Sequence, residues 1–179
     1  MGTTLRSFAL AIAIASLPAV AGRAAATDRE WSDWRYLVGR WIGVGGGHPG
    51  QATAGEFRFE PELGGRILVR RSFAEYAAAP GRPASRHEDL ILLYRETPGG
   101  EARALYLDNE GHVIHYEAVA DTAAGTFVFT SVPNPRLPRY RFSYRALTAD
   151  SLAFRFEIAP PGRRDSLTAY VSGTARRAR

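Results

Sequence analysis

The sequence predicts an all-β protein, a single closed antiparallel β-barrel of about ten strands with a short N-terminal capping helix. From residue 40 onward, apolar and polar residues alternate with the period of two that is typical of half-buried strands. Turn residues such as Thr97-Pro98-Gly99-Gly100 interrupt this alternation at regular intervals. Successive antiparallel strands have no exposed edge when they close into a barrel, which favours a barrel over an open sandwich.

The first 26 residues have the features of a cleaved signal peptide. Arg6 supplies a positive charge, residues 8–20 form an apolar run, and motifs of small residues end at Ala21 and Ala26. The run of about 13 residues is shorter than the roughly 20 that a membrane-spanning helix needs. We therefore expect export to the periplasm or secretion, cleavage after Ala21 or after Ala26, and no membrane span in the mature protein.

Removal of residues 1–26 leaves 153 residues, enough for one barrel domain over 27–175 and a basic tail at 176–179. The chain contains no cysteine, so the fold depends on packing rather than on disulfides. Because the removed segment carries Arg6 and Arg23 and no acidic residue, the net charge falls from +5 to +3. No basic stripe alternates with aromatic residues, which argues against nucleic-acid binding and leaves the oligomeric state open.

A short amphipathic helix is expected over residues 29–38, with Asp28 as its N-cap. Apolar residues recur there at helical spacing: Trp31, Trp34, Leu37 and Val38. We expect Trp31, Trp34 and Trp41 to close one end of the barrel, where each large ring contributes about 2–3 kcal/mol by burial. The alternative is a site where these rings stack on a ligand.

After Gly39 the period changes to two and persists to the end of the chain. The strands expected from this alternation are 40–45, 54–60, 66–76, 87–95, 101–107, 112–119, 125–132, 138–146, 151–158 and 167–174. The loop 77–86 is the longest stretch of small and polar residues, and we expect it at the open mouth of the barrel.

The best-defined turn joins the strands 101–107 and 112–119. Its sequence, Asp108-Asn109-Glu110-Gly111-His112, fits a type I turn followed by a glycine in the left-handed region. This register pairs Asp108 with His112 and Tyr106 with Ile114. One face of the hairpin then carries Tyr106, Asp108, His112, Ile114 and Tyr116.

The segment Gly39-x-Trp41-x-Gly43-x-Gly45-x-Gly47 is similar to the opening of the nitrobindin-like heme-binding barrels and, more loosely, to the Gly-x-Trp motif of lipocalins. His87-Glu88-Asp89-Leu90 and residues 106–112 resemble a bacterial lipocalin-like (calycin) family of unknown function. Its members are single barrels, often with a signal peptide. The resemblance covers residues 31 to about 175 and implies a barrel that holds a small molecule, without identifying the molecule.

Neither heme nor a metal ion is expected. The nitrobindin-like family holds its heme iron through a histidine in the last strand, and the matching residues 163–169 contain no His, Met or Cys. His87 and Asp89 share one face of a strand, as two metal ligands would. His112 and His115, however, point to opposite faces of a strand that lies roughly 10 Å away.

The pair Asp108 and His112 is the strongest chemical grouping in the chain. A histidine opposite an aspartate is oriented and made more basic, which suits proton transfer or hydrogen bonding to a ligand oxygen. The alternative is that Asp108 caps its own turn while His112 is exposed to solvent.

Arginines form the second group of candidates. Arg70 and Arg71 are adjacent in one expected strand, so one of them points into a closed barrel. An inward arginine beside a tyrosine of 138–146 would clamp a ligand carboxylate. The alternative, which we favour slightly, is an internal salt bridge with Glu88 or Glu157.

We therefore expect an exported barrel that holds an apolar or amphipathic small molecule. The expected interior residues are Phe57, Phe59, Phe73, Tyr106, Tyr116, Phe142, Phe154 and Phe156. The expected ligand-binding residues are Arg70, Arg71, His87, Glu88, Tyr106, His112, Tyr116, Tyr140, Arg141 and Tyr144. A binder is favoured over two alternatives, an isomerase, cyclase or hydratase that uses His112 with Asp108, and a ligand-free structural protein of the cell envelope.

Overall fold

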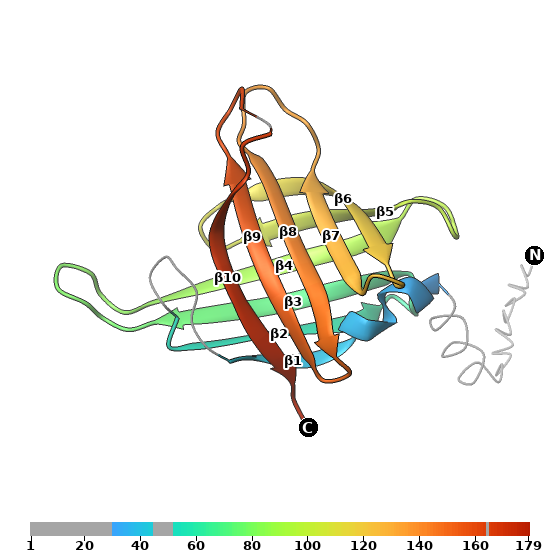
Figure 1. Cartoon of the computed structure of the whole chain (residues 1–179), viewed down its shortest axis with the longest axis horizontal. Coiled ribbons are helices and arrows are strands. Elements are labelled where there is room, and N and C mark those ends of the chain that lie inside the picture. Colours follow the sequence, from blue (N-terminus) through green and yellow to red (C-terminus); the bar gives the residue numbers. More distant parts are fainter. Residues whose placement is uncertain (1–29, 45–51, 164) are drawn as a thin grey trace, which may run out of the picture.

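The computed structural model describes residues 30–44, 52–163 and 165–179, which form ten antiparallel strands closed into one barrel (Figure 1). Each strand pairs with its neighbour in the sequence, and β1 pairs with β10 to complete the circle. The strands are β1 (Gly39–Val44), β2 (Ala54–Glu62), β3 (Ile67–Tyr76), β4 (Ser85–Arg95), β5 (Ala102–Asp108), β6 (Val113–Asp121), β7 (Thr126–Ser131), β8 (Arg139–Thr148), β9 (Ser151–Ala159) and β10 (Thr168–Arg177). The predicted fold class is confirmed, and each strand lies within three residues of its predicted ends.

Some predictions fall on parts of the chain outside the described residues. These are the signal peptide at 1–26, the N-cap Asp28, and the glycines Gly45 and Gly47 of the opening motif. Within the described ranges, no helix combines the length and the apolar character that crossing a bilayer requires.

Where a helix was expected over residues 29–38, the described residues contain a six-residue 3-10 helix, η1 (Ser32–Leu37). It lies across one end of the barrel (Figure 1). Trp34 and Leu37, its two buried residues, are three positions apart. A spacing of three places side chains directly above one another on a 3-10 helix, which has three residues per turn.

The three tryptophans lie at this closed end, as expected. The Trp34 ring packs at centroid distances of 5.7 Å from Phe127 and 5.2 Å from Phe129. Trp31 donates its indole N–H to the carbonyl oxygen of Gly65 at 3.0 Å. Trp41 donates its own to the carbonyl oxygen of Leu37 at 2.9 Å.

The half of the barrel next to η1 is filled with side chains. Alternate residues of the strands point inward and form one apolar core with the tryptophans. Its strand residues include Phe59, Leu68, Leu93, Ala104, Ala118, Phe127, Phe129 and Leu152.

The basic tail expected at 176–179 begins inside the barrel wall. Arg177 is the register partner of Trp41 across the β1–β10 pair, and its guanidinium lies 4.3 Å from the Trp41 ring. It also donates to the carbonyl oxygens of Val38 and Tyr36 at 2.7 and 2.8 Å. Arg177 therefore fastens the last strand to the chain entering the first, because a guanidinium offers five donors in a fixed plane.

We predict that Trp34→Ala lowers the free energy of unfolding by about 3–5 kcal/mol, because the ring is fully buried and its removal leaves a cavity. Urea denaturation followed by circular dichroism measures this change. Val119→Ala is the control, since Val119 is 63% exposed and its truncation should change the value by less than about 0.5 kcal/mol. A loss for Trp34→Ala no larger than that of the control would show that η1 is not part of the core.

Candidate functional site

The half of the barrel away from η1 is hollow. Its cavity measures about 740 Å³ and is lined by side chains of β2 to β6 and β8 to β10. Arg82 and Ser85 at the β3–β4 connection line it as well, so the loop expected at the mouth does border the cavity. None of the three tryptophans lines it. This volume lies within the usual range for small-molecule sites.

A buried ion pair lies at the inner end of this cavity. Arg70 on β3 donates from Nη1 to Oδ1 of Asp89 on β4, and both side chains are buried. The Arg70 guanidinium carbon lies 5.3 Å from the Phe57 ring centroid and 5.2 Å from that of Phe142. Two aromatic faces and one carboxylate thus compensate the desolvated charge of Arg70.

Three tyrosines line the cavity near this end: Tyr116 on β6 and Tyr144 on β8 lie beside the ion pair, and Tyr140 on β8 lies further towards the mouth. Burial raises the pKa of all three hydroxyls above the ordinary value of a tyrosine. For Tyr116 and Tyr144 the positive charge of Arg70 acts in the opposite direction and lowers the pKa. These side chains are therefore protonated over the physiological range and offer neutral O–H groups.

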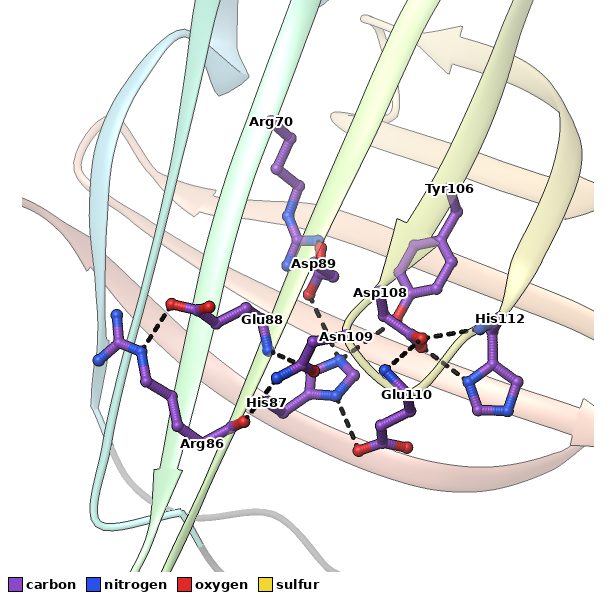
Figure 2. A network of polar contacts seen from close by, with 10 residues as sticks. All are labelled: Arg70, Arg86, His87, Glu88, Asp89, Tyr106, Asp108, Asn109, Glu110 and His112. Atoms are coloured by element: carbon purple, nitrogen blue, oxygen red, sulfur yellow. Dashed lines mark hydrogen bonds and ion pairs between the residues drawn. The ribbon is translucent and has the colours of Figure 1, made fainter.

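Closer to the mouth, a second polar network joins β4 to the β5–β6 hairpin (Figure 2). The His87 ring lies between Glu110 and Tyr106, with Nδ1 3.0 Å from Glu110 Oε1 and Nε2 3.2 Å from the Tyr106 hydroxyl. The same Nε2 lies 3.7 Å from Asp89 Oδ2, which connects this network to the inner ion pair. Tyr106 in turn donates to Asp108 Oδ2 at 3.0 Å.

The hairpin has the predicted register, with Tyr106 opposite Ile114 and Gly111 at a φ of +92°. Asp108 accepts from the backbone N–H groups of Glu110 and His112 at 3.0 and 2.9 Å, and its Oδ2 lies 2.8 Å from His112 Nδ1. Asp108 therefore caps the turn and also orients the imidazole, and a role of the pair in proton transfer stays a prediction. The His112 side chain, 55% exposed, lies at the rim of the cavity.

Asp108 is held as a carboxylate. Its side chain is only 3% exposed, and burial alone raises the pKa. The hydrogen bonds from His112 and Tyr106 outweigh this effect, so the pKa of Asp108 is below the ordinary value of an aspartate.

One group of residues has the composition of a metal site. The candidate ligand atoms of His87, Asp108 and Glu110 lie within 4.8 Å of one another. The Asp108 oxygens, however, already face four hydrogen-bond partners, which an incoming ion would have to displace. That the protein binds neither a metal ion nor heme therefore stays a prediction.

Most of the predicted binding residues line the cavity, and three do not. The inward set is Arg70, His87, Tyr106, His112, Tyr116, Tyr140 and Tyr144. Arg71 and Arg141 form ion pairs on the outer surface with Glu62 and Glu157, and Glu88 pairs outside with Arg86. The positions predicted for Arg71, Glu88 and Arg141 are therefore wrong, because each lies next in its strand to a residue that points inward.

Phe73 is a further correction to the predicted interior. It touches the cavity lining, but it alternates with the inward Ser72, and its ring lies 3.9 Å from the guanidinium of Arg86 on the outer face. Sequence reasoning also paired the inward arginine with the wrong acid. The partner of Arg70 is Asp89, which the sequence suggested only as a metal ligand. Glu110, which contacts His87, was not among the predicted site residues.

Comparisons with known proteins support the fold and assign no activity. No protein-family model matches the chain, and no curated protein matches its sequence. The crystal structure of Rv2717c from M. tuberculosis is similar at 15% identity and a TM-score of 0.58, with 84% of this chain and 98% of that chain covered. The S-type phycobiliprotein lyase CPES from Guillardia theta is similar at 12% identity and a TM-score of 0.49, with 88% and 97% covered. The first likeness supports the fold of this chain, a closed antiparallel barrel.

We predict that Asp108→Asn lowers the free energy of unfolding by about 1–3 kcal/mol at pH 7, because a buried, hydrogen-bonded carboxylate loses its charge. A lowered pKa stabilises the fold above the ordinary carboxyl pKa, and this stabilisation is lost as the pH falls through the lowered value. The difference between wild type and variant should therefore shrink from pH 7 to about pH 3.

Urea denaturation at several pH values measures this difference. Asp150→Asn is the control, because the Asp150 side chain is 80% exposed. A difference between wild type and Asp108→Asn that stays constant with pH would contradict the assigned role of Asp108.

Proposed function

We propose that this protein is an exported carrier that holds an apolar or amphipathic small molecule inside its barrel. The observation that supports the proposal is the cavity of about 740 Å³ in a barrel whose other half is closely packed. A structural protein without a ligand would gain more stability from a filled interior, since empty apolar space forfeits packing energy.

The cavity walls favour a ligand with a large apolar part. Tyr140 and Phe156 are stacked at 5.9 Å with an interplanar angle of 7°, and Phe142 packs edge-on against Phe156 at 6.2 Å. Flat aromatic walls suit rings and extended chains, which they contact over a large area. The Arg70–Asp89 pair and the network around His87 supply polar contacts on β3 to β5, and a few such contacts are enough to orient a ligand.

Export is the second part of the proposal. The apolar run at residues 8–20, followed by small-residue cleavage motifs, supports it. Mass spectrometry of the protein recovered from the periplasm or the medium should give a chain that begins after Ala21 or after Ala26. Recovery of only the full-length chain, from the cytosol, would contradict export.

An enzyme on the same barrel is the alternative, and one observation favours it. His112 Nδ1 is oriented by Asp108 at the cavity rim, which leaves Nε2 for proton transfer to a bound molecule. An isomerase, cyclase or hydratase needs such a base beside an enclosed substrate. The two functions differ in what happens to the bound molecule.

Native mass spectrometry of protein purified from its own compartment identifies that molecule. The released molecule is then incubated with ligand-free protein and followed by NMR. A carrier returns it unchanged, whereas an enzyme converts it, and His112→Gln then abolishes the conversion. Protein that carries no bound mass and binds no apolar probe would contradict both functions.

We predict that Ser72→Trp weakens binding of the uncharged fluorescent probe N-phenyl-1-naphthylamine by at least about tenfold, because the indole occupies the cavity. The matched control is Arg71→Trp at the next position of β3, where the side chain is 52% exposed on the outer face. Fluorescence titration measures both. Equal affinities of the two variants would show that the probe does not bind inside the barrel.

A further inference from the structure

We propose that the inner end of the cavity is a subsite for an uncharged oxygen of the ligand, a carbonyl or a hydroxyl, bound by Arg70, Tyr116 and Tyr144. This inference rests on the proposed carrier function and narrows the chemical class of its ligand. It identifies the ligand as a mainly apolar molecule with a neutral polar head, such as a ketone, an amide or an alcohol.

The donors at this end are not satisfied by the protein. Among the described residues, four buried side-chain donors have no hydrogen-bond partner, and two of them, Arg70 Nε and the Tyr144 hydroxyl, belong to residues that line the cavity. The Tyr116 hydroxyl, on a side chain that is also almost fully buried, makes no hydrogen bond to a described residue either. Buried donors without partners are rare in native proteins because their desolvation is unfavourable, so a polar group supplied from the cavity is expected to bind them.

These donors lie close together. The guanidinium of Arg70 and the ring of Tyr144 share two neighbours, Phe57 and Phe142. The Tyr144 ring centroid lies 5.3 Å from that of Phe57 and 4.7 Å from that of Phe142. Both rings also flank Arg70 at 5.3 and 5.2 Å. Tyr116 lines the same cavity, and its ring and that of Tyr144 both pack edge-on against Phe129, at centroid distances of 6.2 and 6.4 Å.

The charges around the subsite select against an ionic head. Asp89 already neutralises Arg70. Asp108 on β5, the register partner of Asp89, adds a second buried carboxylate. A ligand carboxylate would therefore meet two carboxylates and one guanidinium at this end. A ligand ammonium would be repelled by the positive charge of Arg70, and it offers no acceptor to the donors of Arg70 and the tyrosines. A neutral oxygen accepts from Arg70 and the tyrosines without either repulsion.

This arrangement corrects the carboxylate clamp considered from the sequence. An inward arginine alone would favour a carboxylate, but the adjacent Asp89 cancels its charge while leaving its N–H donors available. The rest of the ligand then extends towards the mouth between Phe142, Phe156 and Tyr140, which line the cavity beyond the subsite.

The test compares three compounds that share one alkyl chain and differ in the head: a methyl ketone, a carboxylate and a primary amine. Each is titrated against the full mature protein at about pH 8, where a carboxylate and a primary amine are both charged. Displacement of N-phenyl-1-naphthylamine gives the affinities. We expect the ketone to bind about tenfold more tightly than either charged compound.

Variants separate the subsite from general apolar binding. Tyr116→Phe and Tyr144→Phe should each weaken ketone binding about three- to tenfold and leave the affinity of the probe unchanged. Asp89→Asn should raise carboxylate affinity at least about tenfold, because Arg70 then keeps an uncompensated charge. The matched controls are Arg71→Gln and Glu88→Gln, neighbours in the same strands whose side chains lie on the outer face and should not alter selectivity.

Each outcome decides the inference. Equal affinities for the three heads, or tyrosine variants with unchanged ketone affinity, would mean that only water binds these donors and would overturn it. If Asp89→Asn does not fold, as judged by circular dichroism, the two tyrosine variants carry the test alone. Failure of the probe to bind wild type contradicts the carrier function itself, whereas probe binding without head selectivity contradicts only this inference.

Discussion

The buried ion pair between Arg70 and Asp89 lies where the packed half of the barrel meets the hollow half. A charged pair in this position is tolerated only where its desolvation is compensated, and the Phe57 and Phe142 rings and the Asp89 carboxylate provide that compensation. The pair therefore limits how far the apolar core extends and gives the cavity one polar end. The orientation of a ligand inside the barrel depends on this boundary.

The closed end makes this arrangement possible. Trp34 projects from η1 and packs on the rings of Phe127 and Phe129. Trp41 donates its indole N–H to the carbonyl oxygen of Leu37 at the end of η1. Arg177 joins β10 to the residues before β1, so the closure of the barrel and the placement of the helix support each other. With one end filled, the cavity opens at the other, where Arg82 and Ser85 after β3 and the hairpin around Asp108 line it.

The strands were predictable because their alternation is long and regular, and turn residues mark their ends. The β5–β6 hairpin was predicted to the level of register, since Asp108 and Gly111 fix one turn type. Between β3 and β4 the residues 77–86 were expected to be a loop at the mouth, yet Ala79 and Arg82 pair around the turn Pro80-Gly81. This turn continues the register of β3 and β4 that sets Ser72 opposite Asp89 and brings Asp89 beside Arg70, so the Pro-Gly pair was the signal for it.

The second property that was hard to predict is which polar side chains point into the barrel and which point outward. In Arg70-Arg71 a charged residue occupies both faces, and alternation alone does not say which arginine is inward. Phe73 shows the reverse case, an aromatic residue on the outer face that is covered by Arg86. The unpartnered donors at Arg70 and Tyr144 depend on three-dimensional packing, so sequence patterns carry no signal for them.

In the proposed carrier the hollow half of the barrel holds the ligand with its head at Arg70. A crystal structure of the protein soaked with a bromine-terminated alkyl ketone would locate both ends of the ligand, because bromine gives an anomalous signal. We expect a ketone oxygen about 3 Å from Arg70 or Tyr116 and a bromine peak towards the mouth, near Tyr140 and Phe156. Bromine found only on the outer surface, with Phe142 and Tyr140 collapsed into the space, would contradict it.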